Sequence, residues 1–248
     1  MQRVLYIFLL AATMLTACKP RHYQTAGMQY GKYDIQPGGR SDTTVANMLK
    51  PYRIQIDSTM YAVVGKLEQT LVKAQPENSL GFFMTDAMLT EGRTAFKTKV
   101  DMAILNYGGI RLNSLQAGNI SMGNMYELMP FDNLLVLVVL DGKLLQQLLD
   151  HVSNMGSWPV SGAGYSVQNK KAINITVGGE PLDSDKKYTV AMGDYVANGG
   201  DNCSFLIGVP QTNIGLTLRD AIINYVRSAS SVGRPIGKPM MNRVSFIP

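Results

Sequence analysis

Three loops of this 248-residue sequence carry side chains that could bind a flat, polar ligand. The first loop is Asn106-Tyr107-Gly108-Gly109-Ile110-Arg111, directly after an apolar run. Its two glycines let the backbone bend sharply and let a ligand approach main-chain amides. Asn106 can donate and accept hydrogen bonds, and the Arg111 guanidinium suits a phosphate or carboxylate. Taken alone, the same residues also fit a Gly-Gly turn with a surface arginine.

The other two loops each place one aromatic ring next to polar groups. Pro130-Phe131-Asp132-Asn133 precedes the most apolar run outside the N-terminal 18 residues, so that Phe131 is either a core residue or a stacking face. Residues 194–201 contain Tyr195, which could stack, and Asp201, which could bind paired hydroxyls, although a polar hairpin loop has the same composition.

A nucleoside would need all the groups that these loops supply. Its base stacks between rings, at roughly 1–3 kcal/mol per base. Its ribose diol suits a carboxylate, and an attached phosphate suits an arginine. This interpretation assumes that the three loops converge, which the sequence alone does not establish.

The sequence lacks a self-contained catalytic centre. Its two histidines, His22 and His151, are too few for a dinuclear metal site. It has no Gly-x-Ser-x-Gly elbow, Walker loop or Gly-x-Gly-x-x-Gly motif. His151 fits a helix C-terminus, where it interacts with the helix dipole, and Cys203 fits a small buried hydrophobe. We therefore predict that the chain does not hydrolyse a substrate efficiently alone.

The elements that must position these loops alternate between strands and helices. The composition, 46% hydrophobic and 17% charged, suits one globular domain or at most two small ones rather than a disordered chain. The net charge of +5 fits either solubility or attraction to anionic ligands or anionic lipid. Periodicity and capping residues predict a mixed α/β sandwich. The helices expected are 42–49, ended by Pro51, then 79–88, 121–129, 143–152 and 216–228; the strands are 61–65, 102–105, 134–140, 164–168, 172–178 and 187–193.

The N-terminal residues predict export and a lipid anchor. Residues 1–18 read as a signal peptide that ends in Leu15-Thr16-Ala17-Cys18, a bacterial lipobox whose Cys18 takes the lipid. An ordinary secretory signal with a chance cysteine is the alternative. Residues 19–40 read as a flexible tether, and 41–248 as the folded domain. We expect the chain in the bacterial cell envelope, on the periplasmic face or outer surface.

Six motifs occur in the order found in one family. They are Glu77-Asn78-Ser79-Leu80-Gly81, Asp86-Ala87-Met88, Asn106 to Arg111, Pro130-Phe131 with Asn133, Ser161-Gly162, and Asn198-Gly199-Gly200-Asp201. Over residues 41–247 the chain resembles the C-terminal domain of 5′-nucleotidases, which periplasmic UDP-sugar hydrolases share. The resemblance implies a four-layer α/β/β/α sandwich that binds the nucleoside. In that family, a separate metallophosphatase domain carries two divalent metals and the catalytic groups. The motifs of that domain are not found in this sequence.

The resemblance also implies roles for single residues. Phe131 and Tyr195 would sandwich the base, with Tyr195 where the family usually has Phe. The polar and glycine positions would meet the base, ribose or phosphate: Asn106, Gly108, Gly109, Arg111, Asn133, Gly162 and Asp201. Three residues depart from the family: Tyr107 replaces a glycine, Lys73 at best replaces an upstream arginine, and Phe82 stands where Asn or Arg is common. These departures weaken the expected grip on phosphate.

Three functions remain open at this point. The first is the substrate-binding half of a split 5′-nucleotidase, with both metals on a separate metallophosphatase chain and no cofactor in this one. The second is a lipoprotein that binds nucleosides without turnover, and the third is a structural protein that has lost the ligand. None of them involves a nucleic acid polymer.

Overall fold

The computed structural model describes residue 31 and residues 42–248. The predicted signal peptide, its Cys18 and, apart from residue 31, the tether lie outside the described residues. The chain divides into two compact units, the first ending at Asn47, and the fold below is that of the second, Met48–Pro248.

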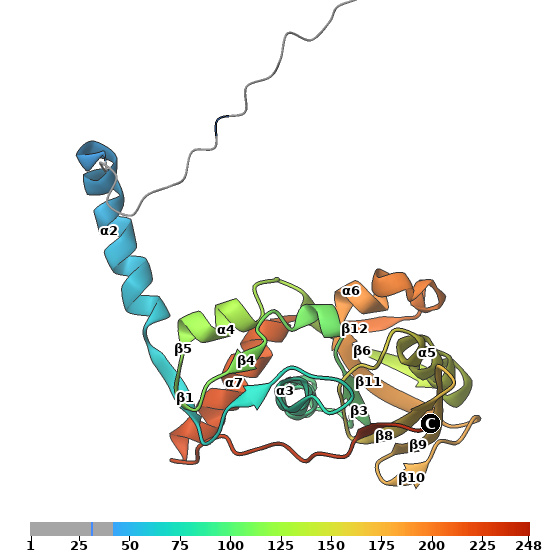
Figure 1. Ribbon diagram of the computed structural model, residues 1–248. Coiled ribbons are helices and arrows are strands. Elements are labelled where there is room, and N and C mark those ends of the chain that lie inside the picture. The colour runs from blue at the N-terminus through green and yellow to red at the C-terminus, as the bar shows by residue number, and fades with distance from the viewer. Residues whose placement is uncertain (1–30, 32–41) are drawn as a thin grey trace, which may run out of the picture. The chain divides into compact units, whose positions relative to one another are not determined.

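A mixed five-stranded sheet forms the centre of the domain (Figure 1). Its strands follow the order β12 (Gln211–Thr217), β6 (Leu134–Asp141), β11 (Lys187–Gly193), β3 (Met102–Ile104) and β7 (Val160–Ser161). β11 pairs with β3 in parallel, whereas β6 is antiparallel to β11. The strands expected at 102–105, 134–140 and 187–193 are therefore confirmed within one residue.

β6 shows why this sheet is buried on both faces. Side chains alternate between the two faces of a strand. Leu135 and Leu137 accordingly join one hydrophobic core, while Val136 and Val138 join a second. A nearly continuous apolar run is the pattern expected of a strand that is covered on both sides.

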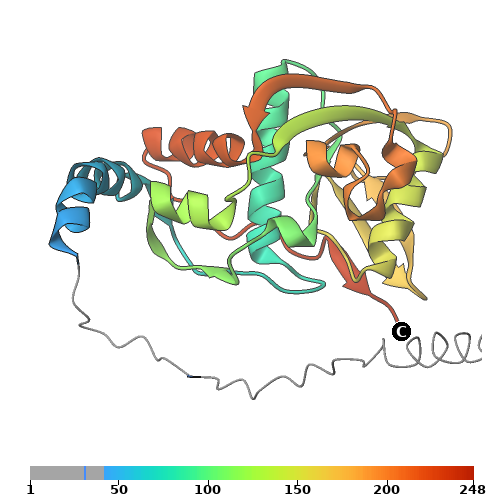
Figure 2. The same cartoon turned by 90° about the horizontal axis from the view of Figure 1, so that it is seen from above.

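Helices α3 (Ser79–Phe96) and α7 (Leu218–Ser231) cover the first face and lie side by side in Figures 1 and 2. Asn78 caps α3 by accepting the Gly81 N–H at 2.8 Å, and Thr217 caps α7 by accepting the Asp220 N–H at 3.0 Å. The capping residues and apolar spacing that predicted α3 are confirmed.

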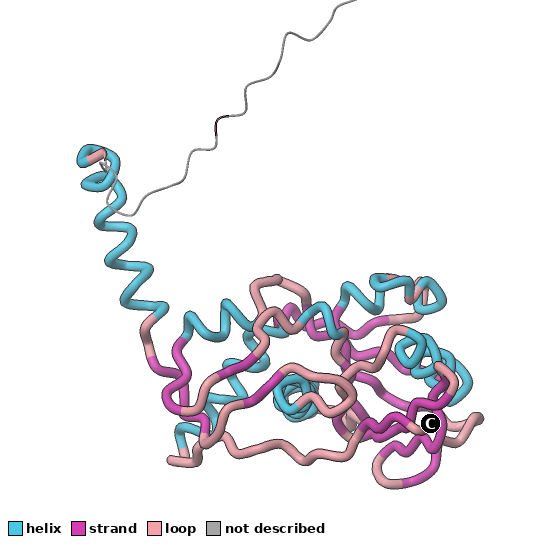
Figure 3. The backbone as a smooth tube through the Cα atoms, in the orientation of Figure 1, coloured by secondary structure: helices cyan, strands magenta, loops and turns pink. Residues whose placement is uncertain are grey.

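Helix α5 (Gly142–Asn154) and a four-stranded sheet share the second core. The sheet has the order β10 (Glu180–Pro181), β9 (Lys171–Val177), β8 (Ala163–Gln168) and β13 (Val244–Phe246). α5 lies beside β9 (Figure 3), and its Asp150 accepts the Ala172 N–H at 2.9 Å. The predicted mixed α/β sandwich is confirmed.

Shorter elements complete the side next to α7. β1 (Val63–Leu67) pairs with β5 (Gly118–Ser121), and β2 (Leu71–Val72) pairs with β4 (Ser114–Leu115). Helix α4 (Met122–Leu128) begins at a capping box in which the Ser121 and Asn124 side chains satisfy each other's backbone.

The prediction that Pro51 ends a helix is wrong. Helix α2 runs over Thr43–Met60 with Pro51 inside it. The φ angle of proline suits a helix, and its ring removes one hydrogen bond, to the carbonyl four residues earlier. Because α2 buries none of its residues, water can satisfy that carbonyl. The residues after Pro51, as far as Met60, therefore continue the same helix.

The sequence also did not predict strand β12 or helix α6 (Asp194–Ala197). β12 carries mostly exposed residues at the edge of the sheet, so it has little of the apolar alternation on which strand prediction depends. α6 is only four residues long and lies in the stretch that was expected to be a loop.

Candidate functional site

The three loops singled out in the sequence meet around one cavity of about 340 Å³. Its wall consists of seven residues, all of them predicted binding residues: Asn106, Gly108, Gly109, Phe131, Asn133, Tyr195 and Asp201. The assumed convergence of the loops is therefore confirmed.

The sheet topology explains why these distant segments come together. β3 and β11 are parallel neighbours, so the residues that follow them, Asn106 and Tyr195, emerge at the same edge of the sheet. β6 runs antiparallel to β11, so the residues that precede it, including Phe131, reach that edge too. Binding groups on loops at one edge of a rigid sheet are a common arrangement for a ligand site.

The polar side of the cavity is a hydrogen-bonded group around Asp201. Asn106 Nδ2 donates to Asp201 Oδ2 at 2.8 Å, and the Tyr195 hydroxyl donates to Asp201 Oδ1 at 3.2 Å. His151 Nε2 lies 2.8 Å from the Asp201 carbonyl oxygen. These contacts fix Asp201 although its φ of 50° is one that few non-glycine residues adopt.

The two aromatic rings are available to a ligand. Phe131 is 41% exposed and Tyr195 is 47% exposed, and both line the same cavity. Gly200 contributes to the position of Tyr195, because a Cβ on Gly200 would come within 2.6 Å of the tyrosine ring. The rings are thus neither buried in the core nor distant from the polar group.

Arg219 supports the segment that carries Phe131, and sequence reasoning missed it. Its side chain is only 9% exposed, and its guanidinium donates to the carbonyl oxygens of Met129 and Phe131 and to Asp132 Oδ1. It also lies over the Tyr126 ring, 4.2 Å from its centroid. Because Arg219 belongs to α7, far along the chain from Phe131, no local motif could have indicated this role.

His151 is a second residue whose role sequence reasoning missed. It lies in the last turn of α5, as predicted, but its ring also reaches across to Asp201 and to the edge of the Phe205 ring, 5.6 Å between centroids. It therefore supports Asp201, which lines the cavity, and its interaction with the helix dipole alone would not suggest this role.

Arg111 lies beside the cavity without lining it. Its Cζ is 5.5 Å from the centroid of the Phe131 ring. Lys73, the residue expected to replace an upstream arginine, donates from Nζ to the Ile110 carbonyl oxygen at 2.8 Å and lies over the Tyr107 ring, 4.1 Å from its centroid. Burial, and then the charge of Arg111, lower the pKa of Lys73.

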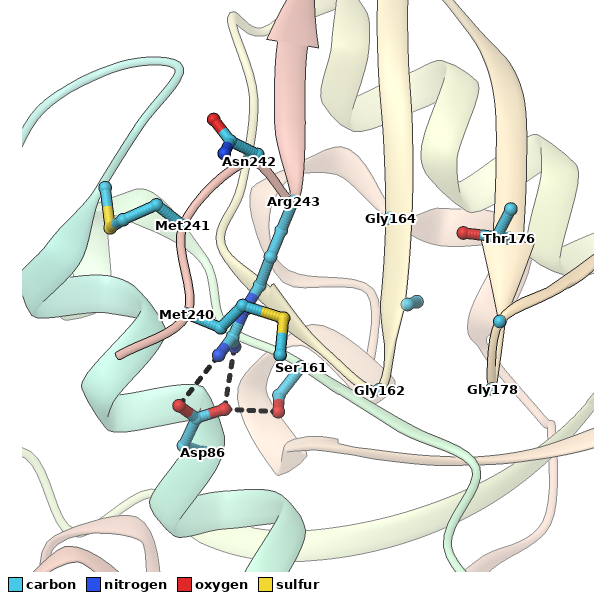
Figure 4. Close-up of a pocket in the computed structure, with 12 residues that line it drawn as sticks. Asp86, Ser161, Gly162, Gly164, Thr176, Gly178, Met240, Met241, Asn242 and Arg243 are labelled. Carbon is cyan, nitrogen blue, oxygen red and sulfur yellow. Dashed lines mark hydrogen bonds and ion pairs between the residues drawn. The ribbon is translucent and has the colours of Figure 1, made fainter. Parts of the chain in front are cut away.

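Gly162 is the one predicted binding residue that the structure places elsewhere. It lines a different pocket, of about 480 Å³, together with Asp86, Ser161 and Arg243 (Figure 4). A Cβ on Gly162 would come within 2.4 Å of the Asp101 carbonyl oxygen, which puts this glycine near the start of β3, whereas Asn106 follows its end. Gly162 has a φ of 72°, which glycine adopts easily, so this residue allows the backbone conformation between β7 and β8.

The polar residues of that second pocket already satisfy each other. Arg243 Nη1 and Nη2 donate to the two carboxylate oxygens of Asp86 at 2.7 and 2.8 Å, and Ser161 Oγ donates to the same carboxylate (Figure 4). This bidentate pair ties the segment before β13 to α3, so we regard it as part of the fold.

Among residue 31 and residues 42–248, no group of three or more His, Cys, Asp or Glu side chains is placed to hold a metal ion. No described helix combines the length and the apolar character needed to cross a membrane.

Comparison with known proteins gives a consistent result. The sequence profile of a family described as "5′-nucleotidase, C-terminal domain" matches residues 63–207. A 5′-nucleotidase of Vibrio parahaemolyticus is 27% identical over 213 residues, which are 80% of this chain and 36% of the relative. Protein UshA of Escherichia coli is 29% identical over 149 residues, 58% of this chain and 27% of that protein.

A solved structure agrees with these sequence matches. The crystal structure of a 5′-nucleotidase precursor from Thermus thermophilus superposes with a TM-score of 0.70 at 26% identity. The superposition covers 83% of this chain and 43% of that one. The chain thus spans less than half the length of each of these relatives.

Proposed function

The chain belongs to the family of 5′-nucleotidase C-terminal domains, and on this basis we propose that it binds the nucleoside part of a nucleotide in the cavity between Phe131 and Tyr195. The base would stack between the two rings. The ribose hydroxyls would reach Asp201, with Asn106 and Asn133 beside the base or sugar. Arg111 would meet a phosphate outside the cavity.

One observation carries this proposal: three segments far apart in the sequence bring seven residues of suitable chemistry to a single cavity. Two exposed rings supply stacking surface, and the only charged group in the wall is the Asp201 carboxylate. A cavity of this kind suits an uncharged heterocycle with a vicinal diol better than it suits a phosphate, which carries the same charge sign as Asp201.

We further propose that this domain is the substrate-binding half of a split 5′-nucleotidase. The family's relatives include 5′-nucleotidases that are much longer than the matched region. In the proposed arrangement a separate metallophosphatase chain supplies two divalent metals and performs phosphoester hydrolysis. We assign no metal ligand to the domain described here.

Binding can be tested by titration calorimetry with adenosine, AMP and a UDP-sugar. We expect Phe131→Ala and Tyr195→Ala each to weaken nucleoside binding by about tenfold, as the loss of one stacking face predicts. Phe246→Ala is the matched control, because Phe246 is 49% exposed on β13 and does not line the cavity. Unchanged affinity in both cavity variants would refute the stacking site.

Turnover requires a second experiment. The full chain is mixed with an exported metallophosphatase of the same bacterium, and phosphate release from AMP is measured. We expect the mixture to exceed the sum of the separate activities, and Phe131→Ala to reduce that excess. If binding is confirmed and no metallophosphatase increases turnover, a nucleoside-binding lipoprotein is the better description.

We also propose that Cys18 carries a lipid that holds the chain at the bacterial cell envelope. The support is the sequence Leu15-Thr16-Ala17-Cys18 behind an apolar run. Each buried methylene of an acyl chain contributes roughly 0.8 kcal/mol, so that two or more chains anchor a protein stably.

A further inference from the structure

We propose that Asp194 is a positioning residue that sets the separation of the two aromatic rings of the cavity. The inference rests on the proposed function, because it concerns the same nucleoside site. Asp194 does not line the cavity, so it would act through Phe131 and Tyr195.

A single carboxylate oxygen joins the two segments that carry the rings. Asp194 Oδ1 accepts the N–H of Tyr195 at 2.8 Å and the N–H of Leu134 at 2.9 Å. Tyr195 carries one ring, and Leu134 lies three residues after Phe131, which carries the other. The contact therefore connects positions about sixty residues apart at the point where β6 begins and α6 begins.

The segment that carries Phe131 is held from its other side by α7. Leu218 N–H donates to the Asn133 carbonyl oxygen at 2.8 Å, and Arg219 holds the carbonyl of Phe131. Between these contacts and Asp194 the segment has little freedom to move toward or away from Tyr195. Without Asp194 the segment would still be held by α7 and by the pairing of β6 with β11 and β12. It would lose the bond from Leu134 to the residue next to Tyr195, and the gap between the rings would vary more.

A variable gap lowers affinity because stacking on both faces of a base requires the rings at a fixed spacing. When a ligand must order its own site, part of the binding free energy is used for that ordering, and the affinity is lower than for a preorganised site.

The test compares two Asp→Ser substitutions at helix N-termini. Asp194→Ser keeps a polar side chain at the first residue of α6 but is too short to bridge Tyr195 and Leu134. Asp141→Ser is the matched control, because Asp141 caps α5 by accepting the Leu144 N–H and does not line the cavity. Asp194→Asn keeps an acceptor oxygen at the same length, so it should restore native behaviour if the bridge is what matters.

Adenosine affinity is measured by calorimetry, and exchange of the Leu134 amide hydrogen by NMR. We expect Asp194→Ser to bind about five- to tenfold more weakly and to exchange the Leu134 amide faster, with Asp194→Asn and Asp141→Ser close to native. Equal affinity in Asp194→Ser and the native chain would overturn the inference, as would faster exchange without any loss of affinity.

Two further outcomes are informative. If Asp194→Ser does not fold, Asp194→Glu decides, because it keeps the charge and adds a methylene that the fixed geometry cannot accept; native affinity in this variant would overturn the inference. Absence of nucleoside binding by the native chain would overturn the proposed function, and the inference with it. Native binding that survives Asp194→Ser unchanged overturns the inference alone.

Discussion

At the scale of single residues, Lys73 and Arg111 differ in whether the protein already provides partners for their positive charge. The Lys73 ammonium already has the Ile110 carbonyl and the Tyr107 ring as partners. The Arg111 guanidinium lies against the Phe131 ring, at the cavity's edge. Tyr107 stands where the family often has glycine. Its ring packs against Lys73 and does not line the cavity.

This difference predicts that two substitutions affect AMP and adenosine binding differently. Arg111→Met should weaken AMP binding by about tenfold and leave adenosine binding nearly unchanged, because Arg111 would meet the phosphate. Lys73→Met should change the affinities for AMP and adenosine by the same factor, since its partners are within the protein. Calorimetry with both ligands checks the pair, and a selective loss of AMP binding in Lys73→Met would contradict it.

Cys203 gives a prediction on pH dependence. Burial, followed by the charge of Asp201, raises the pKa of the Cys203 thiol from 9.0 to about 11. Above pH 9 the unfolded chain would lose this proton while the folded chain keeps it, so the free energy of unfolding falls as pH rises from about 9 to 11. Below that range the thiol is neutral in both states and contributes no slope.

Urea denaturation across that pH range measures this effect. We expect Cys203→Ala to be less stable at pH 8 because of the cavity it leaves, yet to lose stability less steeply than the native chain above pH 9. Parallel curves for the two proteins would show that the thiol does not titrate with a raised pKa.

Residue types and motif order in the sequence were enough to identify the cavity wall, because a binding site needs particular chemistry. They were not enough for Gly162. A glycine is needed there because the backbone has a φ of 72°, and the sequence cannot distinguish such a glycine from one that faces a ligand. Asp194 and Arg219 were missed because their partners lie elsewhere in the chain, and only the fold brings them together.

At the scale of elements, Arg219 attaches α7 to the segment before β6. Arg219 makes three contacts to that segment, and two of them are to backbone carbonyls. Its third partner, Asp132, has a side chain that is 82% exposed. The two carbonyl contacts should therefore contribute more to the attachment than this ion pair does.

Substitutions at the two ends of this pair should therefore have unequal costs. Arg219→Ala is expected to lower the free energy of unfolding by about 2–3 kcal/mol, because the carbonyls of Met129 and Phe131 lose the donor that Arg219 provides. Asp132→Ala should cost less than about 1 kcal/mol, as exposed ion pairs usually do. Urea denaturation of both variants tests this, and equal losses would mean that the ion pair, rather than the carbonyl contacts, holds the segment.

Elements with a strong periodic signal were predicted well, whereas those defined by their neighbours were not. β6 and α5 could be read from an apolar run and a leucine pattern, since each has enough buried residues to show its period. β12 exists because β6 offers it a pairing edge, and none of its own residues is fully buried. The course of α2 through Pro51 could not be read from local preference alone.

At the scale of the whole molecule, the binding surface and the proposed anchor are separate parts of one chain. The cavity belongs to the unit Met48–Pro248, and Cys18, the proposed acylation site, lies about thirty residues before that unit. If Cys18 is acylated, attachment to the membrane and ligand binding should respond to different substitutions.

The last prediction tests that separation. In a bacterium with the lipoprotein pathway, the native chain should fractionate with membranes and incorporate a labelled fatty acid. Cys18→Ser should lose the label and move to the soluble fraction, because the signal peptide alone would no longer leave an acyl anchor. Cys203→Ala, which removes the other cysteine, should remain in the membrane fraction and labelled. Purified Cys18→Ser should bind adenosine as tightly as the native chain. A label that persists in Cys18→Ser would place the acylation elsewhere, and loss of adenosine binding would show that the cavity depends on the N-terminal residues.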